Sequence, residues 1–152
     1  MKRTIIALFV ILLTTVASSK AQDYRFALGV RLSNQSPTLN NSITGKYFVT
    51  DRNAIEGLIS FGSRFGIGAL LEAHRPFNTP GLSWFYGGGA YLGFDSEPSE
   101  TFFGPTGIIG LDYKFNNVPL NLSLDWKPEL DIIPAVNFVP DAFALSVRFT
   151  FK

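Results

Sequence analysis

Residues 143–151 alternate strictly between two kinds of side chain. The apolar parity consists of Phe143, Leu145, Val147, Phe149 and Phe151. The other parity consists of Ala144, Ser146, Arg148 and Thr150. A β-strand sends successive side chains to opposite faces, so this segment predicts a strand with one apolar face and one polar face that carries an arginine.

The same alternation recurs along the chain between stretches of turn residues. The predicted strands cover residues 24–33, 43–50, 54–61, 65–75, 82–94, 107–115, 120–127 and 143–151. Their lengths suit a tilted strand that crosses a membrane, which needs about 9–11 residues. The 152 residues allow at most one domain, and 15 Phe, 5 Tyr and 14 Gly favour strands over helices.

Residues 1–21 have the organisation of a secretory signal peptide. Lys2 and Arg3 precede an apolar run over residues 5–13, and Ser19-Lys20-Ala21 offers small residues where a signal peptidase cleaves. The apolar run is shorter than the roughly 20 residues that a membrane-spanning helix needs. The predicted organisation is therefore a signal peptide, residues 1–21, and one exported domain rich in β-strands, residues 22–152.

Charge and composition exclude several kinds of partner. Removing residues 1–21 lowers the basic residues from 13 to 10 against 12 acids, a net charge of −2, so no nucleic-acid partner is expected. The chain has no cysteine, which excludes disulfides and thiolate metal sites. No metal-ligand spacing or nucleotide-binding motif occurs, and no cofactor is expected.

The connections between the predicted strands differ in length at the two ends. Three are short, at residues 51–53, 76–81 and 116–119, and lie at the end that also holds both termini. The opposite end has four connections. Three of them are longer, at residues 34–42, 95–105 and 128–141, whereas residues 62–64 form a tight turn. Short periplasmic turns and long outer loops are typical of outer-membrane barrels.

Glycine, charge and aromatic residues indicate which face is inside. The polar parity combines charges with Gly29, Gly66, Gly68, Gly87, Gly89, Gly93 and Gly110, which leave room for long side chains in a narrow interior. Aromatic residues mark strand ends on the apolar parity: Tyr24, Phe65, Trp84, Tyr86, Phe94, Tyr113, Phe115, Trp126, Phe149 and Phe151. Such rings resemble the girdles of a membrane–water interface. The alternatives are a soluble ligand-binding barrel, with its apolar face inside, and a soluble sandwich.

Residues 22–152 as a whole resemble the small eight-stranded outer-membrane β-barrels of Gram-negative bacteria, the OmpA/OmpX type. The stretch from Gly107 through Lys114-Phe115 to Asp125-Trp126-Lys127-Pro128 is similar to small barrels of the Bacteroidetes lineage. The resemblance implies an all-β, porin-like, eight-stranded antiparallel up-and-down transmembrane β-barrel in the outer membrane. It also implies that Phe149 and Phe151 signal to the barrel-assembly machinery, although Lys152 follows the final aromatic where many relatives end on it.

Charged residues on the polar parity are expected to fill the interior. The predicted ion-pair layer in the periplasmic half consists of Arg25, Lys46, Glu56, Glu72, Asp112, Lys114 and Arg148. Arg31, Asp125 and Lys127 are predicted at the outer mouth. Unpaired charges would be costly there, so we expect a structural plug of salt bridges, with a gated conduit for protons or small ions as the alternative.

The expected function is structural or surface-interacting, without catalysis and in contact with outer-membrane lipid. A lipid-modifying enzyme is the alternative, but its base would have to be His74, the one histidine, which is predicted at the periplasmic end beside Glu72. The outer connection at residues 128–141 is unusually apolar. Either bent extensions of the neighbouring strands or a surface for a partner would explain this composition.

Overall fold

The computed structural model describes residues 24–34, 38–62, 64–96, 99–140 and 142–152, so the predicted signal peptide lies outside the described residues. The strands are β1 (Phe26–Ser33), β2 (Ser42–Phe48), β3 (Asn53–Phe61), β4 (Phe65–Pro76), β5 (Leu82–Ser96), β6 (Ser99–Lys114), β7 (Leu120–Trp126), β8 (Glu129–Asp131), β9 (Asn137–Val139) and β10 (Phe143–Phe151). The described residues include no helix both long and apolar enough to cross a membrane.

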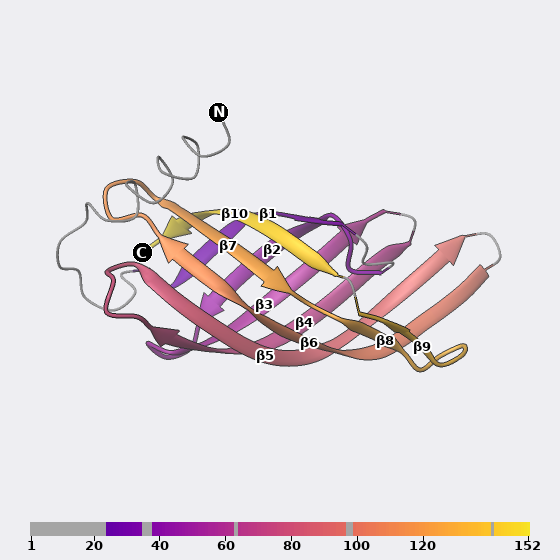
Figure 1. Cartoon of the computed structure of the whole chain (residues 1–152). Helices are drawn as coiled ribbons and strands as arrows, with labels where there is room; N and C mark the ends of the chain where they lie inside the picture. Colours follow the sequence, from indigo (N-terminus) through magenta and orange to yellow (C-terminus); the bar gives the residue numbers. More distant parts are fainter. Residues whose placement is uncertain (1–23, 35–37, 63, 97–98, 141) are drawn as a thin grey trace, which may run out of the picture.

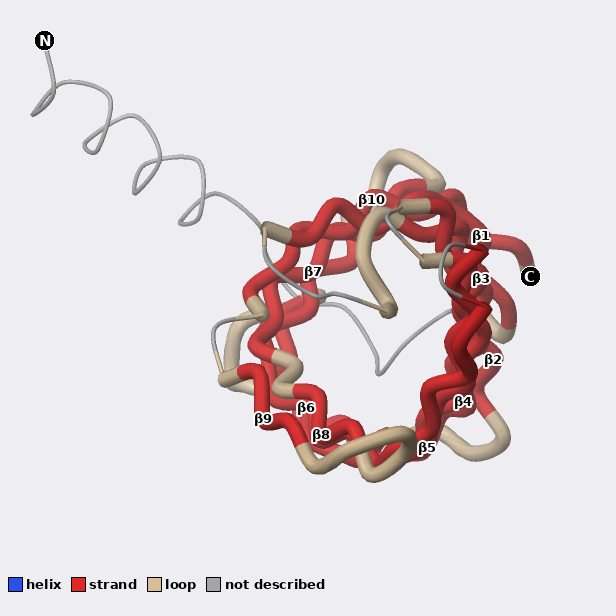
Figure 2. The backbone as a smooth tube through the Cα atoms, turned by 90° about the vertical axis from the view of Figure 1, so that its right-hand side faces the viewer, coloured by secondary structure: helices blue, strands red, loops and turns tan. Residues whose placement is uncertain are grey.

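Eight of these strands close into a barrel. Neighbours pair in the cyclic order β5-β4-β3-β2-β1-β10-β7-β6, and β6 returns to β5. β1 and β10 join the two ends of the sheet, from Phe26 opposite Phe151 to Ser33 opposite Ala144. Figure 2 shows the closed ring. The predicted eight-stranded antiparallel up-and-down barrel is confirmed, and closure leaves the barrel without free edges along its paired length.

The barrel is apolar outside and polar inside. Leu28, Ile55 and Leu71 on the wall are 44%, 43% and 66% exposed, whereas Lys46 and Arg148 are at most 1% exposed. The orientation follows from the alternation, because successive residues of each strand face opposite sides of a single closed sheet. This arrangement is the inverse of a soluble ligand-binding barrel.

The two ends of the barrel differ. The turn end holds the short connections at residues 49–52, 77–81 and 115–119, and the C-terminal strand finishes there (Figure 1). At the opposite end, the hairpin end, β5 and β6 project as a long hairpin. β8 follows β7 along this hairpin, pairing Glu129 with Thr106, and β9 pairs with β8.

The polar loop predicted over residues 95–105 is wrong, because β5 and β6 remain paired up to Ser96 and Ser99. Residues 101–105 keep a two-residue periodicity, so the strand continues through Pro105. A proline is tolerated there since β6 has left β7, which it meets from Ile109 onward. In the connection after β7, residues 129–131 and 137–139 form β8 and β9, which agrees with the expectation of extended strands.

Tyr24 does not join the outer aromatic residues. It is 5% exposed and packs edge-on against Phe48, with 5.3 Å between the ring centroids. A bend at Arg25 shifts the parity, so that Arg25 and Phe26 are both exposed. Other predicted aromatics do face outward at strand ends, among them Phe65, Trp84, Tyr86, Phe94, Trp126, Phe149 and Phe151.

Close contact between β4 and β5 requires glycine at position 89. A Cβ atom there would lie 1.8 Å from the Ala69 carbonyl oxygen, whereas at Gly57 the nearest atom would be 4.0 Å away. We expect Gly89→Ala to lower the free energy of unfolding by about 1–3 kcal/mol through forced backbone movement. Gly57→Ala is the matched control, and equal urea midpoints for the two variants in detergent micelles would contradict this account.

Candidate functional site: the filled barrel interior

Five charged side chains predicted for the interior layer meet near the turn end. This turn-end cluster consists of Lys46, Glu56, Glu72, Asp112 and Arg148, from β2, β3, β4, β6 and β10, and each residue is at most 3% exposed. Lys46 Nζ lies 2.8 Å from Glu72 Oε2, 3.7 Å from Glu56 Oε2 and 3.8 Å from Asp112 Oδ1. One ammonium group on β2 therefore lies close to acids from three other strands, β3, β4 and β6.

Arg148 supplies the second cation of the cluster. Its Nη2 forms an ion pair with Glu56 Oε1, and its Nη1 donates to Ser123 Oγ at 2.8 Å. Its Nε donates to Thr44 Oγ1 at 3.1 Å, and Thr44 in turn donates to Glu56. The guanidinium thus has partners on β2, β3 and β7, so it connects β10 both to its neighbour β7 and, past β1, to β2 and β3.

Aromatic rings separate the turn-end cluster from solvent. His74 is 2% exposed; its Nε2 lies 2.9 Å from Glu72 Oε2, and its ring stacks on Phe85 with centroids 5.0 Å apart. Phe48 packs edge-on against His74, with 4.9 Å between the ring centroids, and Tyr24 packs edge-on against Phe48. Burial and then the negative charge of Asp112 raise the pKa of the Tyr24 phenol well above its usual value, so this covering ring stays neutral.

The turn-end cluster contains one more acid than it has lysine and arginine. Glu56 is engaged by both cations, but Glu72 Oε1 and Asp112 Oδ1 have no hydrogen-bond partner among the described residues. A buried group of charges is stable only when its net charge is small. Glu72 and Asp112, the two less fully paired carboxyl groups, therefore hold the excess acid of the cluster.

An apolar layer lies beyond the turn-end cluster. It consists of the buried side chains Leu39, Leu58, Leu70, Phe85, Tyr91 and Ile108. The sequence analysis missed this layer, because single large apolar residues on a polar parity do not break the overall alternation. Together with the charged residues, these side chains fill the middle of the barrel.

A second set of buried charges occupies the hairpin end. Arg31 pairs with Asp125 at 2.5 Å and Lys127 pairs with Glu129 at 2.7 Å, so the three residues predicted for the outer mouth are each in an ion pair. Arg64 pairs with Asp131 at 3.4 Å. The Tyr91 hydroxyl donates to Asp131 at 2.9 Å and links this set to the apolar layer.

Part of the connection at residues 34–42 inserts into the barrel, although an outward loop was predicted. Thr38 and Leu39 are 0% exposed. The Glu129 carboxylate accepts the backbone N–H groups of Thr38 at 3.2 Å and Leu39 at 3.0 Å, and Arg31 Nη1 donates to the Leu39 carbonyl at 3.3 Å. This segment therefore plugs the hairpin end.

Glycines on β4 and β5 accommodate the plug. A Cβ atom at Gly68 would lie 2.6 Å from Leu39 Cδ1, and one at Gly66 or Gly93 would meet Thr38 at 2.7 Å or 2.6 Å. These three glycines were predicted to make room for long charged side chains. They instead make room for the backbone and side chains of the inserted loop.

Two residues predicted for the interior layer do not join it. Arg25 is exposed at the rim of the turn end. Lys114 lies at the end of β6, where its Nζ donates to the carbonyls of Phe115 and Val118. Arg25 precedes β1 and Lys114 is the last residue of β6, so both lie at the turn end of the barrel, away from the turn-end cluster.

Glu129 and Asp131 were missed because residues 128–141 were predicted as a loop. The signal was present: positions 125, 127, 129 and 131 are all charged and continue the two-residue period of β7 across Pro128. Among the described residues, no group of three or more His, Asp or Glu is placed to bind a metal ion.

Comparison with protein families and with curated protein sequences gives no match. Among solved structures, the chain is similar to the solution structure of outer membrane protein W from Escherichia coli. The TM-score is 0.51 at 13% sequence identity, over 87% of this chain and 100% of that protein. At this identity the likeness concerns the fold, which is that of a closed eight-stranded antiparallel barrel.

The two glutamates beside Lys46 differ in how fully they are paired. We expect Glu56→Gln to lower the free energy of unfolding by about 3–5 kcal/mol, since it leaves Arg148 and Lys46 without their shared carboxylate. Glu72→Gln should cost much less, because it removes the excess acid of the cluster. Urea denaturation in micelles measures both, and a larger loss in Glu72→Gln would contradict the charge assignment.

The plug depends on Glu129. We expect Glu129→Ala to speed hydrogen exchange at the Thr38 and Leu39 amides by about tenfold or more, because charge-assisted hydrogen bonds contribute about 1.5–3 kcal/mol. Glu100→Ala, an exposed acid on the same hairpin, is the control. Unchanged protection of both amides in Glu129→Ala would show that another interaction holds the plug.

Proposed function

We propose that the chain is an integral protein of the bacterial outer membrane, exported by the signal peptide at residues 1–21, with a structural or surface-interaction role. The exposed apolar wall around a buried, charged interior is the observation that carries this proposal. A soluble protein would have to expose a continuous apolar belt, which water disfavours strongly. Outer-membrane lipid is the partner whose chemistry matches this wall.

The filled interior favours a structural role over conduction. Two sets of ion pairs, the apolar layer and the plug occupy the barrel from Tyr24 to Asp131. Wide aqueous channels need about 16 strands, and eight leave room for little beyond side chains. On this proposal the two termini lie in the periplasm, since an even number of strands places them on one side.

The proposal assigns no catalytic role to His74. Its imidazole contacts the Phe48 and Phe85 rings, is 2% exposed and already bonds Glu72, so a lipid substrate has no access to it. Recognition of Phe149 and Phe151 by the barrel-assembly machinery, and membership of the Bacteroidetes-lineage barrels, belong to the same proposal. Phe149 and Phe151 support it by being 58% and 49% exposed on the final strand.

The segment at residues 128–141 is the proposed surface for a partner. Ile132, Val136 and Phe138 are 47%, 77% and 58% exposed around β8 and β9. They lie beside the projecting β5–β6 hairpin, where the barrel is no longer complete (Figure 1). A loop that contacts only water does not need such a cluster of exposed apolar side chains, whereas a surface for a partner does.

Membrane integration predicts that the mature protein is released from an outer-membrane fraction only by detergent. Its gel mobility should change on boiling, because the closed hydrogen-bonded barrel resists unfolding by the detergent at room temperature. Extraction into buffer alone, with no change of mobility on boiling, would contradict the proposal.

The surface role predicts site-specific contact in intact cells. A photoreactive residue at Val136 should give a discrete cross-linked product that the additional change Phe138→Ser weakens severalfold. The same probe at Leu145 on the wall should give lipid adducts and no such product. Equal protein products from both positions would remove the support for a partner at residues 128–141.

A further inference from the structure

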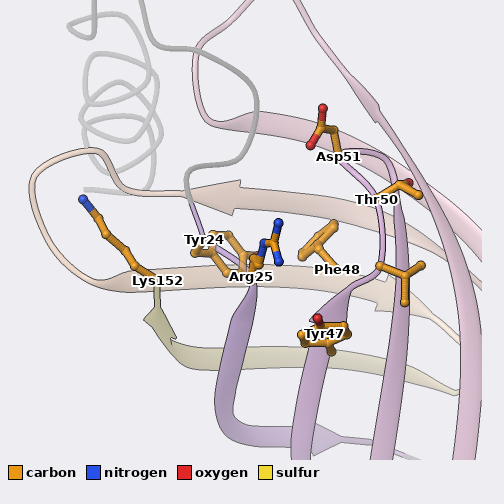
Figure 3. Close-up of a pocket in the computed structure, with 8 residues that line it drawn as sticks. Tyr24, Arg25, Tyr47, Phe48, Thr50, Asp51 and Lys152 are labelled. Atoms are coloured by element: carbon orange, nitrogen blue, oxygen red, sulfur yellow. The ribbon is translucent and has the colours of Figure 1, made fainter.

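A cavity of about 480 Å³ opens at the turn end (Figure 3). Its lining residues are Tyr24, Arg25, Tyr47, Phe48, Val49, Thr50, Asp51 and Lys152. The volume lies within the range of about 300–1,000 Å³ that is common for small-molecule sites. Tyr24 and Phe48 are buried, so they form its floor and separate it from the turn-end cluster.

The cavity crosses the rim of the barrel. Tyr47 and Val49 are outward-facing, 46% and 51% exposed, and belong to the apolar wall. Arg25 lies between β2 and β10, because its carbonyl accepts the Phe48 N–H at 2.8 Å and its N–H donates to the Phe151 carbonyl at 3.2 Å. A bound molecule could therefore lie against the wall and still reach the charged groups at the opening.

The charged groups of the cavity are of both signs. Arg25 and Lys152 are exposed cations, and neither forms a salt bridge within the described part of the chain. Asp51 lines the same cavity, and in Figure 3 it lies on the opposite side of Arg25 from Lys152. This arrangement presents donors for an anion at one side and an acceptor for a cation at the other.

We infer that this cavity binds the headgroup of a phospholipid with a primary ammonium, a phosphoethanolamine, from the periplasmic leaflet. Arg25 and Lys152 bind the phosphate, since guanidinium and ammonium groups form charge-assisted hydrogen bonds to phosphate oxygens. Asp51 accepts the ammonium N–H groups. The acyl chains lie on the wall beside Tyr47 and Val49, where an aromatic ring suits the interface.

This inference rests on the proposed membrane location and adds a specific ligand to it. A generally basic rim would attract anionic lipid without discrimination. Arg52 is an exposed cation of the same rim outside this cavity, so it separates the two possibilities. The acid in the cavity predicts a preference that general attraction does not: ethanolamine over choline, which has no N–H to donate.

The test is native mass spectrometry of the full mature protein in non-ionic detergent with phosphatidylethanolamine, phosphatidylcholine or inorganic phosphate. We expect Arg25→Gln and Lys152→Gln each to lower the retained phosphatidylethanolamine about fivefold, the effect of one cation near a membrane surface. Arg52→Gln should retain about as much phosphatidylethanolamine as the unchanged protein. Asp51→Asn should abolish the preference for ethanolamine over choline.

Equal lipid retention in Arg25→Gln and Arg52→Gln, or no ethanolamine preference in the unchanged protein, would overturn the inference. Displacement of the lipid by equimolar inorganic phosphate would show a free-anion site and overturn it as well. The four substituted residues, at positions 25, 51, 52 and 152, are exposed. The mobility shift of each variant on boiling checks that its barrel is intact. If the unchanged protein needs no detergent, the proposed function fails; if only the lipid readouts fail, the membrane location stands.

Discussion

The interior of an eight-stranded barrel has room for little more than its own side chains, and this limit determines how the charges of the chain are arranged. Lys46 and Arg148 are at most 1% exposed, so each must meet acids from other strands. Those contacts connect β2, β3, β4, β6 and β10 across the barrel axis. The backbone ladder closes the ring, and the turn-end cluster fixes the positions of its opposite walls.

The sequence predicted the fold well because every barrel strand has the same alternation, with apolar side chains on one face and polar or small ones on the other. Alternation in residues 143–151 places Arg148 inside, and the same rule places Lys46, Glu56, Glu72 and Asp112 beside it. The rule fails where the strand parity shifts, as at Tyr24. It also cannot predict that Arg148 donates hydrogen bonds to Thr44 and Asn121, since these contacts depend on the register between strands.

The plug was not predictable from local patterns. Residues 34–42 are polar and contain a proline, which is typical of an exposed loop. The inward position of Thr38 and Leu39 depends on Glu129, about 90 residues away, and on the space above Gly66 and Gly68. Glu129 was itself hidden by the assumption that strand pairing ends at Pro128. The missed plug and the missed Glu129 therefore have one origin, an underestimate of how far β5 and β6 continue at the hairpin end.

The central claim is that the apolar face of the sheet contacts lipid. Because the chain has no cysteine, single substitutions Leu145→Cys, Val147→Cys and Phe149→Cys can carry a nitroxide spin label, with Asn116→Cys at a turn as the reference. In lipid vesicles the account predicts that the three wall positions are accessible to dissolved oxygen and protected from a water-soluble nickel complex, with the reverse at position 116. Collision of the nickel complex with all three wall positions would contradict it.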